Sequence, residues 1–185
     1  MHAMTDLKPL TALVIIDMQK GMLSAGPRNN PDAESHVASL LSHWRERCLP
    51  IVHVRHLSRS PGSPFWPGQP GAEFQDLLAP QASEHIVDKH VTDAFAHSGF
   101  ERWLHRRGIH ALVFVGVSTN MSVEATVRSA ACLGFDCSVV ADACYTYDRP
   151  DIDGRSRSAE DIHRVALANL SGEYARILRS ADLLA

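Results

Sequence analysis

Short runs rich in valine and isoleucine alternate along this chain with longer segments of helical periodicity, and this alternation constrains the fold more than any other feature. Nearly continuous apolar strands separated by helices are typical of a parallel sheet that is buried on both faces. Six runs are predicted as strands: Thr11–Asp17, Pro50–His56, Glu84–Lys89, Ala111–Val117, Cys137–Ala141 and a short one near Ala175–Leu178. The predicted fold class is therefore α/β.

The segments between these runs have the spacing of helices that pack one face on a sheet. Four helices are predicted, at Ala33–Trp44, from about Ser98, at Asn120–Leu133 and at about Ser158–Asn169. Asn30 and Pro31 are predicted as the N-cap and first-turn proline of the first helix. Ser98 and Glu101 have the spacing of a capping box at the start of the second.

The segment between the second and third predicted strands is rich in residues that break regular structure. Positions 59–71, RSPGSPFWPGQPG, place four prolines and three glycines around Phe65 and Trp66. So many breakers predict a loop.

Length and composition limit the class of protein. A chain of 185 residues is predicted to form one compact domain over residues 1–185. With 45% hydrophobic and 21% charged residues, intrinsic disorder and a disulfide-rich miniprotein are excluded. The net charge is -3 and the basic residues are scattered, so no nucleic-acid partner is expected. A neutral small molecule is the more suitable partner for a chain with this charge.

Location is predicted from what the chain lacks. No apolar run approaches the roughly 20 residues that span a bilayer, so no membrane partner is expected. The first ten residues lack the basic and then apolar pattern of a secretory signal, which favours a cytoplasmic protein. The four cysteines have neither CxxC nor zinc-ligand spacing, so we expect reduced, mostly buried thiols and no disulfide.

Three polar residues stand where predicted strands end. Asp17 ends the first strand, Lys89 ends the third, and the turn GVSTNMSV leaves the fourth strand and contains Ser122. Ligands of parallel sheets bind outside the carboxyl ends of the strands. We therefore expect Asp17, Lys89 and Ser122 to lie within a few ångströms of one another.

Four segments resemble the isochorismatase-like cysteine hydrolases, a family that includes nicotinamidases, N-carbamoylsarcosine amidases and ureido-amide hydrolases. They are VIIDMQKGM, DKHVTDAF, VGVSTNMSVEATVRSA and VVADACYTYD, and the resemblance covers nearly the whole chain. It implies a three-layer α/β/α fold with a six-stranded parallel sheet. It also implies a homodimer or homotetramer.

The resemblance has one departure, at the nucleophile. It implies a catalytic triad of Asp17, Lys89 and a cysteine, but Ser122 occupies the cysteine position. Because a serine hydroxyl ionises much less readily than a thiol, the same surroundings activate it poorly. Either serine was introduced in place of a natural cysteine, or the natural protein carries serine.

The resemblance also implies how the triad works. Asp17 would be the general base that takes the proton of the nucleophile and delivers it to the leaving amine. Lys89 would orient Asp17 and lower the pKa of the nucleophile. A cis peptide bond between Val117 and Ser118 would turn the amides of Ser118 and Ser122 toward a forming oxyanion.

Other polar and aromatic residues near the predicted site are candidates for substrate binding. Phe65, Trp66, Tyr145 and Tyr147 would border the mouth of the pocket, or they pack under loops. Thr119 and Asn120 could hydrogen-bond the substrate, or they stabilise the turn.

No cofactor is predicted. His53 and His56 form HxxH, but residues three apart on a strand point to opposite faces, so joint metal ligation is not expected. The Asp-x-His motif of metal-binding nicotinamidases is absent, and no metal is predicted. Neither a GxGxxG nor a P-loop motif supports a nucleotide.

Three functions remain open. The leading hypothesis is hydrolysis of a small amide or ureide C–N bond through an acyl-enzyme, because the turn GVSTNMSV and the loop SPFWPGQPG resemble the amidase branch of the family. The second is isochorismatase chemistry, in which an acidic residue protonates a vinyl ether and no thiol is needed. The third is a binding or scaffold protein that has lost its nucleophile.

Overall fold

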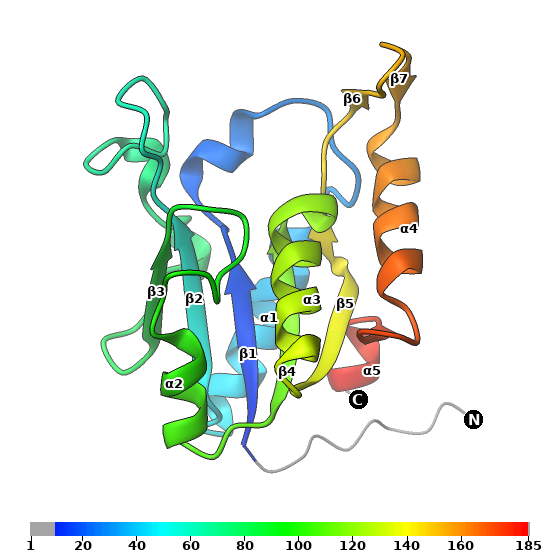
Figure 1. Cartoon of the computed structure of the whole chain (residues 1–185). Helices are drawn as coiled ribbons and strands as arrows, with labels where there is room; N and C mark the ends of the chain where they lie inside the picture. The colour runs from blue at the N-terminus through cyan, green and yellow to red at the C-terminus, as the bar shows by residue number, and fades with distance from the viewer. Residues whose placement is uncertain (1–9, 185) are drawn as a thin grey trace.

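A parallel six-stranded sheet forms the centre of the structure, a computed structural model that describes residues 10–184. The strand order is β3-β2-β1-β4-β5-β8, and every neighbouring pair is parallel (Figure 1). The strands are β1 Thr11–Ile16, β2 Ile51–His56, β3 His85–Lys89, β4 Ala111–Val117, β5 Asp136–Tyr145 and β8 Arg176–Leu178. All six predicted strands are present.

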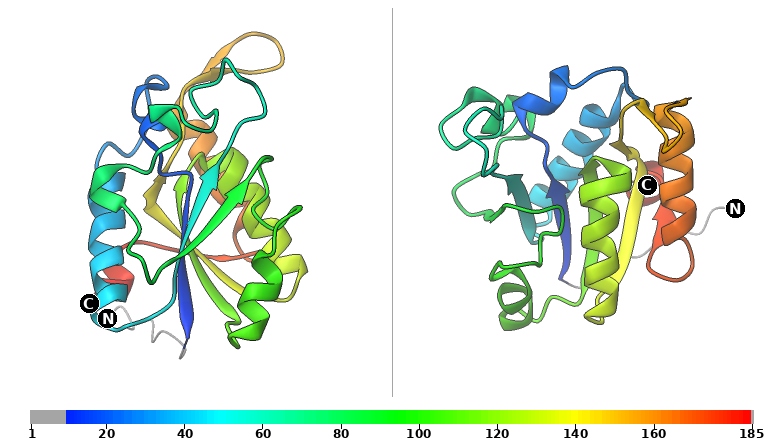
Figure 2. Two further views of the ribbon diagram at one scale, coloured as in Figure 1. Left: turned by 90° about the vertical axis from the view of Figure 1, so that its left-hand side faces the viewer. Right: turned by 45° about the horizontal axis from the view of Figure 1, so that its top comes forward.

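Helices cover both faces of the sheet (Figure 2). One face packs against α1 (Ala33–Glu46) and α5 (Ala181–Leu184). The other packs against α2 (Phe100–Arg106), α3 (Glu124–Cys132) and α4 (Ala159–Leu170). The predicted three-layer α/β/α fold is thus confirmed.

The sequence of β1 explains why two hydrophobic cores form. All six of its residues are buried. Because side chains alternate along a strand, Val14 and Ile16 enter the core beneath α2 and α3, whereas Leu13 and Ile15 enter the core beneath α1. A strand that contributes to both cores must be apolar at every position, as TALVII nearly is.

Gly116 lets β4 approach β1 next to the candidate site. Its φ is +124°, a conformation that L side chains rarely adopt. A Cβ atom at this position would collide with the backbone oxygen of Ile16. The pairing of β4 with β5 shifts register between Phe114 and Gly116. The strand therefore changes course just before the turn that carries Ser122.

Both predicted helix caps differ from the structure. Asp32, rather than Asn30, is the N-cap of α1. The Asn30 side chain instead donates to the backbone oxygens of Ala141 and Cys144, at 3.0 and 2.6 Å. Gly99 is the N-cap of α2.

The capping box predicted for α2 does not form. Ser98 Oγ accepts from the amide of Phe100 and donates to the backbone oxygen of Ala94, rather than capping through Glu101. The Ser98 side chain thus stabilises the loop that precedes the helix.

Further differences lie near the carboxyl ends of the strands. The predicted helix 120–133 begins with a π-helical turn, Thr119–Val123, and continues as α3. A two-stranded hairpin, β6 (Arg149–Pro150) and β7 (Ser156–Arg157), and the short helix α5 were not predicted. The loop between β2 and β3 contains two 3₁₀ turns, at Pro70–Ala72 and Asp76–Leu78.

Two predictions concern features outside the layers. None of the helices within residues 10–184 is long and apolar enough to cross a membrane. The first residues of the chain, on which the cytoplasmic prediction was based, lie mostly outside the described part.

The cysteines agree only in part with the prediction of reduced, mostly buried thiols. All four are free thiols, but only Cys137 and Cys144 are buried. Cys48 and Cys132 are exposed and lie at the ends of helices.

Candidate active site

The candidate site lies at the carboxyl edge of the sheet, where three strands end. Asp17 directly follows β1 with a φ of 53°, and its amide donates to the backbone oxygen of Val54 at 3.0 Å. Lys89 is the last residue of β3. Ser122 lies in the π-helical turn after β4. The order of the strands places β1 between β4 and β2, so these ends converge.

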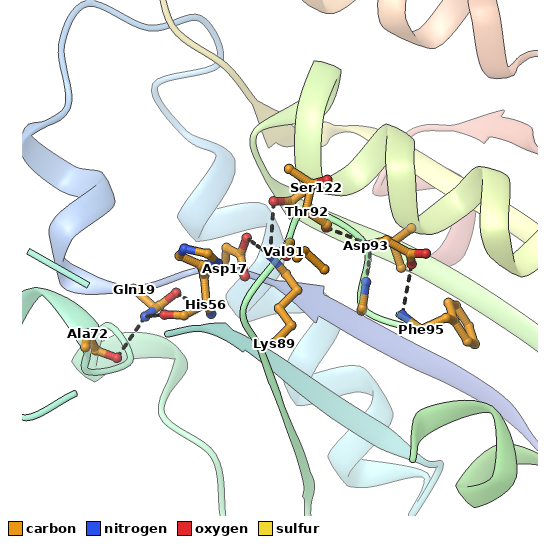
Figure 3. A network of polar contacts seen from close by, with 12 residues as sticks. Asp17, Gln19, His56, Ala72, Lys89, Val91, Thr92, Asp93, Phe95 and Ser122 are labelled. Atoms are coloured by element: carbon orange, nitrogen blue, oxygen red, sulfur yellow. Dashed lines mark hydrogen bonds and ion pairs between the residues drawn. The ribbon is translucent and has the colours of Figure 1, made fainter. Parts of the chain in front are cut away.

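The three side chains meet as predicted (Figure 3). Lys89 Nζ donates to Asp17 Oδ2 at 2.7 Å, to Ser122 Oγ at 3.2 Å and to the backbone oxygen of Val91 at 3.1 Å. An ammonium group has three protons, so every donor of Lys89 has a partner. The lysine side chain is thus held in one position between Asp17 and Ser122.

Burial distinguishes the nucleophile candidate from its neighbours. Asp17 and Lys89 are each 1% exposed, whereas Ser122 is 8% exposed. Ser122 is therefore the most exposed residue of this cluster. Burial raises the pKa of the Asp17 carboxyl above its ordinary value, and the charge and hydrogen bond of Lys89 oppose this. A raised pKa suits a carboxylate that accepts a proton and returns it.

The turn that leads to Ser122 is held by its own backbone. The peptide bond between Val117 and Ser118 is cis. The oxygen of Ser118 accepts from the amides of Met121 and Val123, at 3.0 and 3.2 Å. An oxyanion hole formed by the amides of Ser118 and Ser122 stays a prediction.

Thr119 and Asn120 are engaged by the protein. Thr119 is fully buried, and its Oγ1 lies 2.8 Å from Nδ1 of His163 on α4. Asn120 Oδ1 accepts from the hydroxyl of Thr146 at 2.6 Å, and the residue lines a hollow of about 420 Å³ beside α4. These contacts favour the alternative that both residues stabilise the turn.

Phe65 lies close to the site, and its position depends on a glycine. Its ring meets that of His56 with centroids 6.1 Å apart at an angle of 71°. A Cβ atom on Gly21 would lie 2.8 Å from Phe65 Cε1, so any other residue at this position would have to displace the ring. Trp66 is half-buried in the same loop, and its role in binding stays a prediction.

Tyr145 does not border an open pocket mouth, so that prediction is wrong. The residue is 0% exposed and belongs to the core beneath α1. Its ring lies under the guanidinium of Arg28, 4.2 Å from the ring centroid. Tyr147 is half-buried, and its hydroxyl donates to the backbone oxygen of Met22. Both tyrosines thus pack beneath loops.

Two residues near Asp17 were not among the predicted site residues. Gln19 is fully buried and bonds both backbone groups of His56. His56 is half-buried, and Figure 3 shows its ring beside Asp17. Strand alternation gives a signal for His56, because it continues the series Val52, Val54 toward the carboxyl edge. A polar residue that ends such a series faces the site.

His53 and His56 do point in different directions. His53 is fully buried, and its Nε2 lies 2.8 Å from Glu84 Oε2, while His56 faces Asp17 and Phe65. Within the described residues, no group of three or more histidine, cysteine or acidic side chains is arranged to hold a metal ion.

The three-layer fold, with Asp17, Lys89 and Ser122 together at the carboxyl edge of its parallel sheet, matches the arrangement expected of isochorismatase-like hydrolases. Comparison with known proteins identifies the family directly. Residues 11–182 match the Isochorismatase domain. The chain belongs to the isochorismatase family.

Relatives of the chain include proteins of known and unknown activity. Isochorismatase family protein YrdC of Bacillus subtilis (strain 168) is 32% identical over 94% of each chain. Streptothricin hydrolase of Streptomyces noursei is 33% identical over 89% of this chain and 57% of its own length. Nicotinamidase 3 of Arabidopsis thaliana is 25% identical over 91% of this chain and 84% of its own length.

A solved structure shares the whole fold. A hydrolase of the isochorismatase family from Chromobacterium violaceum ATCC 12472 is 44% identical, with a TM-score of 0.95. The match covers 100% of this chain and 97% of that one. The chain is thus an isochorismatase-family hydrolase.

Proposed function

We propose that this protein hydrolyses the C–N bond of a small amide or ureide through an acyl-enzyme. The observation that carries the proposal is the contact of one buried ammonium, Lys89, with both the Asp17 carboxylate and the Ser122 hydroxyl. Relatives named streptothricin hydrolase and nicotinamidase support an amide as substrate.

The steps use the residues of this cluster. The atom at position 122 attacks the carbonyl carbon while Asp17 accepts its proton. When the C–N bond breaks, Asp17 gives that proton to the leaving amine. Water then attacks the acyl carbon and gives a proton to Asp17. When the bond to residue 122 breaks, Asp17 returns this proton to the side chain of residue 122, and the acid is released. The amides of Ser118 and Ser122 stabilise the negative oxygen in both steps.

Lys89 contributes charge. Its ammonium keeps Asp17 oriented through the 2.7 Å contact and lies 3.2 Å from the nucleophile candidate. A positive charge at this distance stabilises an anionic nucleophile. This charge favours ionisation of a cysteine at position 122 more effectively than ionisation of a serine, because a thiol ionises nearer to neutral pH than a hydroxyl does.

The test compares the Ser122 protein with its Ser122→Cys variant on a panel of amides and ureides, with ammonia release as the readout. If serine replaced a natural cysteine, turnover rises by orders of magnitude in the variant. If serine is the natural nucleophile, the Ser122 form already turns over and the variant is comparable or slower. In either case Asp17→Ala abolishes activity.

Two results would contradict the proposal. Release of products from isochorismate, dependent on Asp17 and insensitive to residue 122, would identify vinyl-ether hydrolysis instead. Complete inactivity of both forms on every compound would favour a binding or scaffold protein.

We also propose that the protein acts in the cytoplasm as a homodimer or homotetramer. The support for the assembly is the resemblance to the family, together with exposed apolar side chains near α4 and the hairpin, those of Met121, Ile152 and Val165. A monomer in light scattering at micromolar concentration would contradict the assembly.

A further inference from the structure

His56 lies on the same face of the sheet as the lysine of the candidate site. In the pairing of β2 with β3, His56 is directly opposite Lys89. Val52 and Val54, which precede His56 at alternate positions, are buried in the core beneath α2 and α3. Because alternate residues of a strand share a face, His56 is the next side chain of this row and the first outside the core.

The backbone of His56 is fixed relative to Asp17 by a buried glutamine. Gln19 Oε1 accepts from the amide of His56 at 2.9 Å, and its Nε2 donates to the oxygen of His56 at 3.0 Å. The same Nε2 donates to the oxygen of Ala72 at 2.9 Å. Gln19 is two residues beyond Asp17 and is 0% exposed. The imidazole is therefore presented from a rigid position.

Two polar groups beside each other lack protein partners. Within residues 10–184, the ring nitrogens of His56 form no hydrogen bond with the protein, although the residue is half-buried. Asp17 Oδ1 is buried and also has no hydrogen-bond partner. Figure 3 shows the imidazole next to this carboxylate. Unpartnered polar atoms are rare in protein interiors, so this pair points to a ligand with its own polar groups.

Burial and the nearby cations together favour the neutral form of the His56 ring. Burial lowers the pKa of the imidazole, and the nearby Lys89 ammonium and His90 lower it further, while Asp17 opposes them. A neutral imidazole has one N–H donor and one nitrogen acceptor. A carboxamide or ureide has the complementary pair, a carbonyl oxygen and an N–H.

Phe65 completes a corner of two rings. Its plane makes an angle of 71° with that of His56, and their centroids are 6.1 Å apart. A flat group in such a corner can stack on one ring while its edge meets the other. An amide or ureide group is planar, and it can hydrogen-bond in its own plane.

We propose that His56 is a substrate-binding residue that hydrogen-bonds the amide or ureide group of the substrate, and that with Phe65 it selects a neutral, planar substrate with a free N–H. This inference rests on the proposed amidase function. It assigns specificity to a histidine that has no part in the Asp17, Lys89 and Ser122 cluster.

The kinetic test uses whichever of the Ser122 and Ser122→Cys proteins is active. His56→Phe keeps an aromatic ring without polar atoms, and we expect KM to rise by about three- to tenfold, as for loss of a hydrogen bond. His56→Asn, which keeps a donor and an acceptor, retains part of the affinity. N,N-dimethyl analogues, which lack the N–H, lose less from His56→Phe than the parent amides do.

The control is His110→Phe, since His110 is exposed and precedes β4 at the opposite edge of the sheet. Its KM is expected to be unchanged. If the parent enzyme is active and His56→Phe has the same KM for all amides, the inference is wrong while the proposed function stands.

A binding measurement tests the role of His56 without any need for turnover. In histidine-labelled Ser122 protein, the NMR signals of the His56 ring, assigned with the His56→Asn variant, are followed as the same panel of amides and ureides is added. We expect them to shift with at least one compound. Absence of any shift with all compounds would overturn the inference, even if the protein lacks hydrolytic activity.

Discussion

Lys89 Nζ lies 2.7 Å from Asp17 Oδ2, and both side chains are almost completely removed from solvent. Such a pair is costly to break, because removal of one partner leaves an uncompensated charge in the interior. The stability of the fold and the proposed catalytic reaction therefore depend on the same two residues.

The first prediction is a double-mutant cycle on this pair. Lys89→Met leaves a buried carboxylate without its counter-ion, and we expect a loss of about 3–5 kcal/mol in the free energy of unfolding. Asp17→Leu together with Lys89→Met should lose less than the sum of the two single changes. Urea unfolding measures all four proteins. Additive losses would contradict a direct electrostatic coupling.

The second prediction concerns a thiol placed at position 122. In Ser122→Cys, Lys89 is expected to hold the pKa of the new thiol below the usual value of about 8.5. The pH dependence of iodoacetamide labelling, read by peptide mass spectrometry, gives this pKa. Adding Lys89→Gln should move it upward, with the exposed Cys48 of the same protein as internal reference. An unchanged labelling profile would show that Lys89 does not act on the thiol.

The third prediction concerns the space that Gly21 leaves for Phe65. In Gly21→Ala the new Cβ would lie 2.8 Å from Phe65 Cε1 and 3.1 Å from the backbone oxygen of Gly71. We expect a loss of about 1–3 kcal/mol in unfolding free energy, as for overpacking, and weaker substrate binding. Gly62→Ala, in the same loop as Phe65 and with nothing within 4 Å of its Cβ, is the matched control. Equal stability of the two variants would contradict the packing.

The fourth prediction concerns pH and the buried His163, which contacts Thr119. Burial lowers the pKa of this imidazole in the folded protein, with Glu160 opposing. As pH falls through the unfolded-state pKa near 6.5, the unfolded chain binds a proton that the native protein does not. The contribution of neutral, buried His163 to the free energy of unfolding is therefore complete above about pH 7. It decreases as the pH falls toward the lowered pKa of the folded protein, and below that pKa it decreases no further.

Variants separate His163 from the other histidines. His163→Gln should make the dependence of Tm on pH less steep between pH 7 and 5, whereas His110→Gln, an exposed control, should not. Part of the dependence remains in His163→Gln, because burial also lowers the pKa of His53. A slope identical to that of the parent would exclude His163 as a contributor.

Much of this protein could be predicted from its sequence because the determining patterns are local. The apolar runs and helical spacing located every strand of the main sheet, since periodicity records which side of an element is buried. Parallel strands present their carboxyl ends at one edge, and this rule, together with the family resemblance, predicted that Asp17, Lys89 and Ser122 lie together.

Contacts between distant segments decided the rest. Asn30 has the local chemistry of an N-cap, yet it bonds two β5 oxygens that lie 111 and 114 positions away. Tyr145 looked like a residue of a pocket mouth, but Arg28 covers its ring. Thr119 turns to His163 on α4. A local pattern indicates the face of a side chain, whereas the partner on that face depends on how the whole chain packs.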